Sequence, residues 1–432
     1  MRNRFVGVVG VTALTVAAIG GSAAQVAAQD PITITVWGHQ GQDNEVAATK
    51  KAVEDFNALN NGIKVDFTFI PEGDYGTTLG ATKPEDLPDV LELPGENASS
   101  LVYAGKLGVL DGVLDQATLD NQTASTKAEG TVNGQRYAVA QFDSGLALYG
   151  NKALLDAAGV AYPTTWQDAW TADEFDAALK ALAAKDEDGK VLDIKENYAG
   201  TWPGYAFLPV VNSAGQLAVK GGAATGHLNA PEVAAALSRF ADWKQYVDPS
   251  ADDKAFTDGR AALGWVGHWQ YTVNKEALGD NLVVIPLPDF GAGTKSGQGS
   301  YAWGISSTTD QKDAAATFLE FMMADEQVAG ITDVNGAPPG TTTATAKSAL
   351  YAPGGPLQLY ADQLAVSCGG GDVELTKDCV DVPRTISPAW PVINDAFSKA
   401  FWNIYNGADA QAELDAAAKA IDQDYADNNG YQ

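Results

Sequence analysis

Ile32-Thr33-Ile34-Thr35-Val36-Trp37, Glu45–Asn60 and Ile63–Phe69 are the three consecutive segments that decide the fold. The first alternates β-branched and apolar residues, which is typical of a strand. The second carries apolar residues on one helical face and ends at Asn60-Asn61-Gly62, a helix stop signal. The third again has apolar residues at every second position. A strand, a helix and a strand in this order predict two parallel strands with a right-handed crossover.

The rest of the chain continues this α/β pattern. Pro88–Leu93 predicts a third strand, and Thr171–Glu174 forms a capping box that opens a helix. Two later helices are predicted over Asp310–Ala324 and Pro391–Tyr405. A chain of 432 residues is too long for one ordinary hydrophobic core, so we expect at least two domains.

The N-terminal segment, residues 1–28, has the pattern of a signal peptide. Arg2 and Arg4 precede an uncharged run, Phe5–Ile19, that is shorter than the ~20 residues needed to span a bilayer. Val26-Ala27-Ala28 satisfies the small-residue rule for signal peptidase, so we expect cleavage after Ala28. No cysteine lies near this point, and we therefore expect no lipid anchor. The sequence predicts an exported protein, located in the periplasm of a bacterium with two membranes.

The two cysteines, Cys368 and Cys379, flank a glycine-rich polar segment. In an oxidising compartment such a pair predicts a disulfide. Two thiols without nearby histidines fill only half of a tetrahedral metal shell, so metal binding is the weaker alternative. The closed loop is short, and the chain-entropy model gives it about 2–3 kcal/mol of stabilisation.

Charge and composition exclude several classes of function. With 27 Lys+Arg against 55 Asp+Glu, the net charge is −28. So acidic a surface repels phosphate backbones and anionic lipids, which excludes nucleic-acid binding. Three histidines and two cysteines leave little material for a zinc site or for histidine-based catalysis. We expect no metal and no cofactor.

The sequence contains no catalytic signature. A Gly-x-Ser-x-Gly nucleophile elbow, a Walker loop and a His-Glu-x-x-His motif are all missing from it. A pair of carboxylates for glycoside hydrolysis stays open, but with 55 acidic residues any chosen pair is uninformative. We expect that the protein is not an enzyme and has no catalytic residue.

Several of the ten tryptophans lie beside glycines, which leave indole faces less covered. Sugars present apolar C–H faces that stack on aromatic rings, and hydroxyls that need planar polar partners. Trp202, Trp269 and Trp303 are the tryptophans that we expect to contact a ligand, although each could instead be a core residue. Other tryptophans are expected to be structural: Trp166 (as a plug in the core of the second domain), Trp170, Trp243 and Trp402.

A series of short motifs runs through the mature chain in a family-specific order. They are Ile34–Trp37 with a helix ending at Phe56-Asn57, Leu87–Val90, Ala104–Leu107 with Leu110-Asp111, Gly134–Ala140, Leu148–Lys152, Ala157–Trp166, Phe256–Trp269 and Ala314–Glu326. In this order the chain resembles the extracellular solute-binding proteins of ABC sugar importers, the family that includes maltose-binding protein. Gly150 departs from the family pattern, which has an aromatic residue there, and the cysteine pair is not a general family feature.

The resemblance implies a type II periplasmic binding protein fold, an α/β fold of two lobes joined by a hinge. Lobe one would hold residues 31–141 and 299–338, and lobe two residues 145–287 and 343–432. The crossings would fall near Gln141–Gly145, Pro286–Gly299 and Pro338–Thr343. A sugar would be clamped between the lobes.

The resemblance also implies a function and a set of site residues. The protein would act as a monomer that captures a mono- or oligosaccharide and delivers it to the membrane permease subunits of an ABC importer. Candidate ligand-binding residues are His39, Gln40, Glu96, Asp143, Trp202, Trp269, Trp303 and Arg384. Arg384 could instead pair structurally with an acid. The alternatives are a binding protein for another polar solute, such as a polyol or glycerol phosphate, and a secreted glycoside hydrolase.

Overall fold

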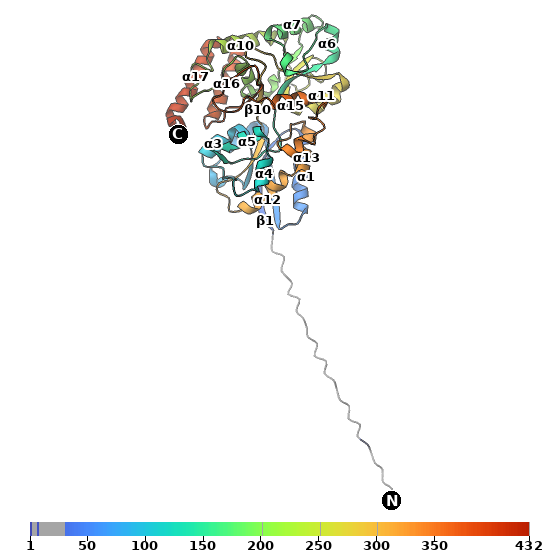
Figure 1. Ribbon diagram of the computed structural model, residues 1–432, viewed down its shortest axis with the longest axis vertical. Coiled ribbons are helices and arrows are strands. Elements are labelled where there is room, and N and C mark those ends of the chain that lie inside the picture. The colour runs from blue at the N-terminus through green and yellow to red at the C-terminus, as the bar shows by residue number, and fades with distance from the viewer. Residues whose placement is uncertain (2–6, 8–30, 201, 251, 300, 432) are drawn as a thin grey trace.

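The computed structural model describes Met1, Gly7 and residues 31–200, 202–250, 252–299 and 301–431. Apart from Met1 and Gly7, the predicted signal peptide lies outside these residues. The described chain forms two lobes, stacked one above the other in Figure 1. Within the described residues each lobe is built on a four-stranded sheet. The predicted two-lobe α/β architecture is thus confirmed.

Lobe 1 contains the predicted β-α-β unit. Its sheet has the order β11-β3-β1-β2. The strands are β1 (Ile32–Gln40), β2 (Ile63–Pro71), β3 (Val90–Pro94) and β11 (Tyr301–Ile305). β1 pairs in parallel with β2 and β3, whereas β11 pairs antiparallel with β3. The predicted helix between the first two strands is α1 (Asp43–Ala58).

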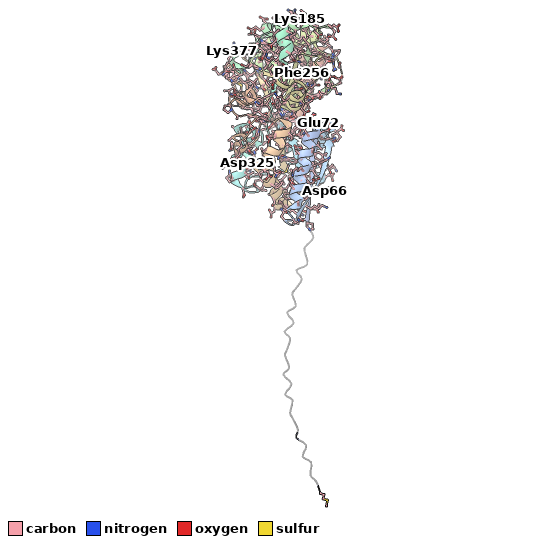
Figure 2. All side chains as sticks on the ribbon, turned by 90° about the vertical axis from the view of Figure 1, so that its right-hand side faces the viewer. Asp66, Glu72, Lys185, Phe256, Asp325 and Lys377 are labelled. Atoms are coloured by element: carbon pink, nitrogen blue, oxygen red, sulfur yellow. A yellow bond between two sulfur atoms is a disulfide. The ribbon has the colours of Figure 1, made fainter. Side chains whose placement is uncertain are left out.

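The C-terminal ends of the parallel strands in lobe 1 face lobe 2. Figure 2 shows Glu72, which directly follows β2, near the level where the lobes meet, and Asp66 of β2 farther from it. Ligands of open α/β sheets bind outside the carboxyl ends of the strands. The orientation of this sheet therefore places its ligand-binding edge at the junction between the lobes.

Helices and short elements complete lobe 1. They are α2 (Glu72–Ala81), η1 (Pro84–Asp86), η2 (Gly95–Asn97), α3 (Ala98–Tyr103), α4 (Gln116–Asn121), α5 (Ala124–Glu129), the hairpin of β4 (Thr131–Val132) and β5 (Gln135–Arg136), α12 (Lys312–Met322) and α13 (Asp325–Asn335). α12 confirms the helix predicted over Asp310–Ala324. It packs Phe318 against Phe56 of α1, with the ring centroids 5.2 Å apart.

Lobe 2 has a mixed sheet with the order β7-β8-β6-β9. Its strands are β6 (Leu146–Asn151), β7 (Leu192–Asp193), β8 (Leu263–Gly267) and β9 (Leu282–Ile285). The helices are α6 (Lys152–Ala158), η3 (Trp166–Asp168), α7 (Ala172–Ala183), η4 (Glu196–Tyr198), α8 (Trp202–Ala206), α9 (Leu208–Ser213), α10 (Pro231–Asp242), η5 (Trp243–Tyr246), η6 (His268–Gln270), α11 (Tyr271–Leu278), η7 (Gly279–Asn281), α14 (Thr342–Thr345), α15 (Gln358–Leu364), α16 (Trp390–Tyr405), α17 (Ala410–Asp427) and η8 (Asn429–Tyr431). The capping box at Thr171 and Glu174 is formed as predicted.

Aromatic rings fill the core of lobe 2. Phe207 stacks on Phe401 with the ring centroids 4.3 Å apart, and Trp243 packs edge-on against Phe175 at 4.7 Å. Trp170 and Trp243 are buried in this core, as predicted. Trp166 is only half-buried in η3 and lies outside the core cluster, so the prediction that it plugs the core is wrong. The residues around it explain this, because most of η3 is exposed on the surface.

Three segments carry the chain between the two sheets. Gln141–Asp143 runs antiparallel to Pro338–Gly340, with hydrogen bonds of 2.8 Å from Asp143 N–H to the Pro338 carbonyl and from Gly340 N–H to the Gln141 carbonyl. A Cβ on Gly340 would lie 2.5 Å from the Ala140 carbonyl oxygen, so this close approach requires glycine. The third segment contains β10 (Ser296–Gln298), which pairs in parallel with β12 (Asp381–Pro383).

The predicted disulfide joins Cys368 to Cys379. It closes a ribbon in which Val380 N–H donates to the Val366 carbonyl at 2.8 Å and Cys368 N–H donates to the Asp381 carbonyl at 2.7 Å. The ribbon leads directly into β12. No helix in the described part of the chain has the length and apolar character required to cross a membrane.

Candidate functional site

The two lobes touch on both sides of their junction. On one side, the end of α13 in lobe 1 contacts lobe 2, where Thr272 Oγ1 donates to the Val334 carbonyl at 3.1 Å. On the other side, Tyr103 of α3 meets Tyr431 near the C-terminus edge-on, with the ring centroids 5.0 Å apart. Figure 1 shows the C-terminus beside α3 at this second contact. The structure is therefore a closed arrangement of the lobes.

Three half-buried aromatic rings of lobe 2, Trp202, Tyr205 and Trp269, form what we call the aromatic wall. Trp202 and Trp269 meet edge-on with the ring centroids 6.0 Å apart, and Tyr205 lies 5.9 Å from Trp202 and 6.0 Å from Trp269. The ring of Trp269 lies against the backbone of Gly267, where a Cβ would come within 2.1 Å of it. A glycine at this position is therefore a requirement for the wall.

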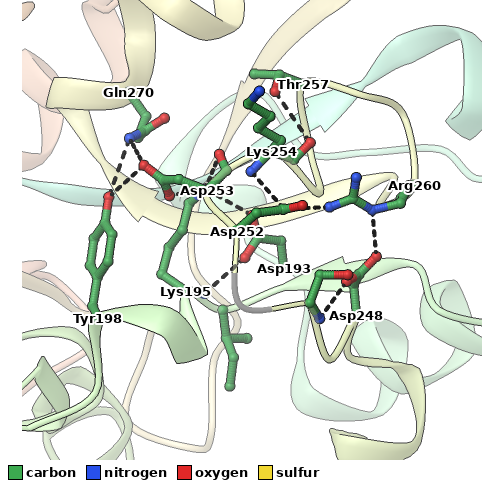
Figure 3. Close-up of polar contacts among 12 residues, drawn as sticks. Asp193, Lys195, Tyr198, Asp248, Asp252, Asp253, Lys254, Thr257, Arg260 and Gln270 are labelled. Atoms are coloured by element: carbon green, nitrogen blue, oxygen red, sulfur yellow. Dashed lines mark hydrogen bonds and ion pairs between the residues drawn. The ribbon is translucent and has the colours of Figure 1, made fainter.

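A polar network contacts the aromatic wall through Trp269. The indole N–H of Trp269 donates to the Tyr198 hydroxyl at 3.4 Å. That hydroxyl donates to Asp253 Oδ2 at 3.4 Å (Figure 3). Gln270 Nε2 donates to the Tyr198 hydroxyl oxygen at 3.2 Å and to Asp253 Oδ2 at 3.1 Å. Burial, together with the charge of Asp253, raises the pKa of Tyr198 to about 12, so the hydroxyl keeps its proton.

Two cations fix the acidic residues of this network. Buried Lys195 lies 2.8 Å from Asp253 and 2.9 Å from Asp193. Burial alone would lower the pKa of Lys195, but the two carboxylates outweigh it and raise the pKa above its ordinary value. Arg260 holds the adjoining loop through three further aspartates. It lies 3.1 Å from Asp248 and 2.5 Å from Asp252 (Figure 3), and 3.0 Å from Asp258.

Arg384 connects the aromatic wall to lobe 1. Its guanidinium carbon lies 4.7 Å from the centroid of the Tyr205 ring, a cation–π contact. Its Nη1 lies 2.6 Å from Oε1 of Glu96 in η2, and both side chains are largely buried. Burial raises the pKa of Glu96, and the attraction of Arg384 opposes this shift.

Asp143 links the first crossing segment to the same place. It is buried, accepts a hydrogen bond from Ser125 Oγ in lobe 1, and accepts another from the Ser144 N–H at 2.7 Å. The Ser144 hydroxyl in turn hydrogen-bonds to the Tyr205 hydroxyl of the wall. Burial raises the pKa of Asp143, whereas these hydrogen bonds lower it.

Two acidic residues that the sequence interpretation missed complete the junction. Asp381 of β12 and Glu129 of α5 are both buried, and a Cβ on Gly299 would lie 2.5 Å from Glu129 Oε1 and 2.9 Å from Arg384 Nη2. We call Glu96, Glu129, Asp143 and Asp381 the acidic cluster. Nothing in the sequence marks either residue, because 55 acidic residues are spread through this chain.

His39 lies in a separate charged group at the end of β1. Its Nδ1 is 2.8 Å from Glu92, and its Nε2 is 3.5 Å from Glu45 and 3.6 Å from Glu72. Burial alone would lower the pKa of His39, but these three carboxylates outweigh it and raise the pKa to about 10. The imidazolium stacks on the Tyr301 ring with the centroids 3.6 Å apart.

The structure brings together five of the eight residues predicted for the ligand site. Trp202, Trp269, Asp143, Glu96 and Arg384 join through the contacts described above. His39 approaches from lobe 1, and Tyr301 beneath it packs against Phe142 of the first crossing. Gln40 is exposed at the end of β1.

Trp303 lies away from the aromatic wall. It is 2% exposed in the core of lobe 1, edge-on to Phe67 and Phe318. Its indole N–H donates to Gln141 Oε1 at 3.1 Å, which ties the core to the first crossing. Its neighbour Gly304 explains this position, because a Cβ there would lie 2.9 Å from a Leu107 methyl group. Gly304 thus makes room for the Leu107 side chain in the core and does not expose the Trp303 ring.

The donor set does not suit a metal. Among the described residues, no group of three or more His, Cys, Asp or Glu side chains could hold a metal ion. Aromatic faces, carboxylates and a guanidinium at one junction are the groups that bind a polar, ring-shaped molecule.

Comparisons with known proteins agree with this geometry. The family model described as "Bacterial extracellular solute-binding protein" matches residues 41–329. A multiple sugar-binding protein of Streptococcus mutans is 26% identical over 352 residues, which cover 77% of this chain and 80% of that protein.

Solved structures have the same fold. An ABC substrate-binding protein of Listeria monocytogenes in complex with cycloalternan matches with a TM-score of 0.75 at 22% identity, covering 92% of this chain and 100% of that one. A maltose/maltodextrin-binding domain of Bdellovibrio bacteriovorus bound to maltotriose matches with a TM-score of 0.74 at 18% identity, covering 91% of this chain and 100% of the other.

Proposed function

Because the chain belongs to the family of bacterial extracellular solute-binding proteins, we propose that it captures a carbohydrate between its two lobes and delivers it to an ABC importer. Members of this family bind solutes and do not transform them, so the protein is not an enzyme. The carbohydrate is a mono- or oligosaccharide. The named relatives that bind sugars support this choice of solute.

The observation that carries the proposal is the aromatic wall beside the acidic cluster and Arg384. The C–H face of a sugar ring stacks on indole and phenol rings. Carboxylates accept hydrogen bonds from sugar hydroxyls, and a guanidinium donates to their oxygens in a planar fork. Trp202, Tyr205 and Trp269 supply the rings, and Arg384 with Glu96 supplies the polar groups.

Capture would proceed by hinge closure. The hinge would lie in the two crossing segments that pair at Gln141–Asp143 and Pro338–Gly340, because these segments connect the lobes. A change in the backbone torsions of such short connections rotates one lobe relative to the other. In an open form each lobe carries half of the site. A sugar that touches both halves binds the closed form better and shifts the population toward it.

Delivery requires export and a membrane partner. Residues 1–28 would direct the chain across the cytoplasmic membrane, into the periplasm of a bacterium with two membranes. There a monomer would carry both half-sites, and the permease subunits of the importer would recognise its closed shape.

A titration series tests this function. The chain without residues 1–28 is titrated calorimetrically with mono- and disaccharides, and the recovered sugar is analysed by chromatography. Binding at micromolar affinity or tighter, about −8 kcal/mol, with the sugar recovered unchanged, supports the proposal. Hydrolysed sugar would identify a glycoside hydrolase. Binding of a polyol or glycerol phosphate without binding of any sugar would assign a different solute.

A further inference from the structure

Asp381 of β12 carries a carboxyl group that the closed structure leaves without a partner. The residue is 1% exposed, and both side-chain oxygens are buried without a hydrogen bond among the described residues. Two other acids of the junction are held differently. Glu96 pairs with Arg384 at 2.6 Å, and Asp143 accepts hydrogen bonds from a serine hydroxyl and from a backbone N–H. Closure therefore encloses Asp381 in a site that offers its carboxylate no donor.

Two further carboxyl groups face Asp381, one from each side of the junction. Asp143 lies on the first crossing segment and Glu129 on α5 of lobe 1, and both repel a negative charge on Asp381. A buried carboxyl group without water or a donor favours its neutral form, and neighbouring carboxylates favour that form further. Burial and this repulsion accordingly raise the pKa of Asp381 well above its ordinary value. In the closed structure Asp381 is thus a neutral carboxylic acid.

The other titratable groups near Asp381 do not neutralise it. Arg384, three residues further along the chain, directs Nη1 to Glu96 and its guanidinium plane to Tyr205. Lys295, which directly precedes β10, donates through Nζ to backbone carbonyls, the nearest at 2.7 Å. Tyr205 is neutral, because burial raises the pKa of its hydroxyl. Among the described residues no ion pair reaches Asp381, so a proton is the group that removes its charge.

Opening of the lobes would reverse this environment. Asp381 belongs to lobe 2 and Glu129 to lobe 1, so separation removes one repelling carboxylate and admits water to the junction. β12 keeps its place in lobe 2, because the Asp381 carbonyl accepts from the Cys368 N–H at 2.7 Å and the Val380 carbonyl accepts from the Ser296 N–H at 3.0 Å. A hydrated aspartate has a pKa of about 3.9. The same side chain is then charged at neutral pH in the open form.

We propose that closure of the lobes around the ligand takes up a proton at Asp381, so that capture becomes weaker as the pH rises. This inference rests on the proposed function, because it describes the regulation of the same site. A group that binds a proton only in the closed form favours closure at low pH. Above the pKa of the open form, each further pH unit reduces the affinity by up to about tenfold, until the pKa of the closed form is reached.

The proton can be counted by calorimetry. The chain without residues 1–28 is titrated at pH 7 with maltotriose and with the mono- and disaccharides of the series above, in PIPES and in imidazole, two buffers with different heats of ionisation. The difference between the two binding heats gives the number of protons taken up. We expect the unmodified chain to take up about one proton more for each sugar bound than Asp381→Asn does.

The affinity of the same variant gives an independent test. An asparagine has the shape of the neutral acid but cannot ionise. Between pH 5 and pH 8 we expect the affinity of the unmodified chain to fall tenfold or more and that of Asp381→Asn to change less than threefold. At pH 8 the variant should bind at least tenfold more tightly than the unmodified chain, the opposite of what the loss of a ligand contact causes.

Asp378→Asn is the matched control. It removes the same charge from an exposed position in the adjacent loop, and it should keep the pH dependence and the proton count of the unmodified chain. A thermal melt of each variant at each pH confirms folding. The proton count of the unmodified chain needs no substitution, so it tests the inference even where a variant does not fold.

The outcomes separate the two proposals. Sugar binding without proton uptake overturns the proton inference and leaves carbohydrate capture standing. Equal proton uptake by the unmodified chain and Asp381→Asn overturns the assignment to Asp381. Binding of a polyol or glycerol phosphate without binding of any sugar overturns carbohydrate capture, and the proton count with that solute then decides the proton inference.

Discussion

Arg384 and Glu96 form a buried ion pair across the lobe junction, with Nη1 2.6 Å from Oε1. Glu96 belongs to lobe 1, and Arg384 follows β12 at the edge of lobe 2 and covers the Tyr205 ring. Any rotation that separates the lobes breaks this pair. The contact therefore belongs to the closed form, together with the rim contact between Tyr103 and Tyr431.

Removing the cation of this pair should weaken ligand binding. In Arg384→Gln the closed form buries Glu96 without a partner, and closure becomes less favourable. We expect a 10- to 100-fold loss of carbohydrate affinity, about 1.4–2.8 kcal/mol, in a calorimetric titration. Arg239→Gln, which breaks an exposed ion pair with Asp173, should leave the affinity unchanged. Equal effects of the two variants would contradict the account.

Truncating the aromatic wall should have a similar consequence. Trp269→Ala removes a half-buried ring that contacts both Trp202 and Tyr205. We expect carbohydrate binding to weaken at least tenfold, on the order of 1.4 kcal/mol, with little change in melting temperature. Trp402→Ala provides a control at another half-buried tryptophan, on α16. An unaltered affinity in Trp269→Ala would remove this ring from the site.

The polar network at Trp269 should act by positioning. Tyr198→Phe deletes the hydroxyl that accepts from Trp269 and donates to Asp253, while the ring of Tyr198 remains. We expect a two- to fivefold loss of affinity, about 0.4–1 kcal/mol, because Trp269 loses one restraint but not its packing. Titration of this variant beside Trp269→Ala and the double variant measures the coupling. Strict additivity would show that Tyr198 does not act through Trp269.

The disulfide should stabilise lobe 2. Replacing Cys368 and Cys379 with serine removes a short covalent loop at the base of β12. We expect a loss of about 2–3 kcal/mol in the free energy of unfolding, measured by urea denaturation. Reduction of the unmodified chain should reproduce this loss and should not affect the serine variant. An unchanged denaturation midpoint in both experiments would contradict the prediction.

The charge of His39 should make stability depend on pH. Three carboxylates outweigh the effect of burial and raise the pKa of His39 from 6.5 to about 10. Because the pKa is raised in the folded state, the stabilisation is complete below about pH 6.5 and is lost as the pH rises toward 10. We therefore expect His39→Gln to lower the free energy of unfolding at pH 6 and to lower it much less near pH 10. A pH-independent difference would contradict the raised pKa.

Periodicity and local signals predicted most of the fold. The β-α-β unit, the capping box at Thr171 and the disulfide follow from residues close in sequence, where spacing alone fixes the structure. Whether a tryptophan lies in the aromatic wall or in a hydrophobic core depends on packing against residues that are distant in the sequence. Gly267 makes room for the Trp269 ring, whereas Gly304 makes room for a neighbouring leucine of the core.

The acidic half of the site was harder to predict. Tyr205, Glu129 and Asp381 belong to residue types that are abundant in this sequence, and nothing near them in the chain marks them out. These three residues can be recognised as site residues only in the folded structure, where β12, α5 and α8 meet at the lobe junction. Arg384 was predicted from the family resemblance, and it is one of few basic residues in the candidate loops.

Small-angle X-ray scattering of the chain without residues 1–28, with and without its best-binding sugar, tests the central claim most directly. Capture between two hinged lobes predicts that the sugar-free chain has the larger radius of gyration and that the complex scatters as the closed structure does. Binding of a sugar with no change in the radius of gyration, and with the open form retained, would contradict the account.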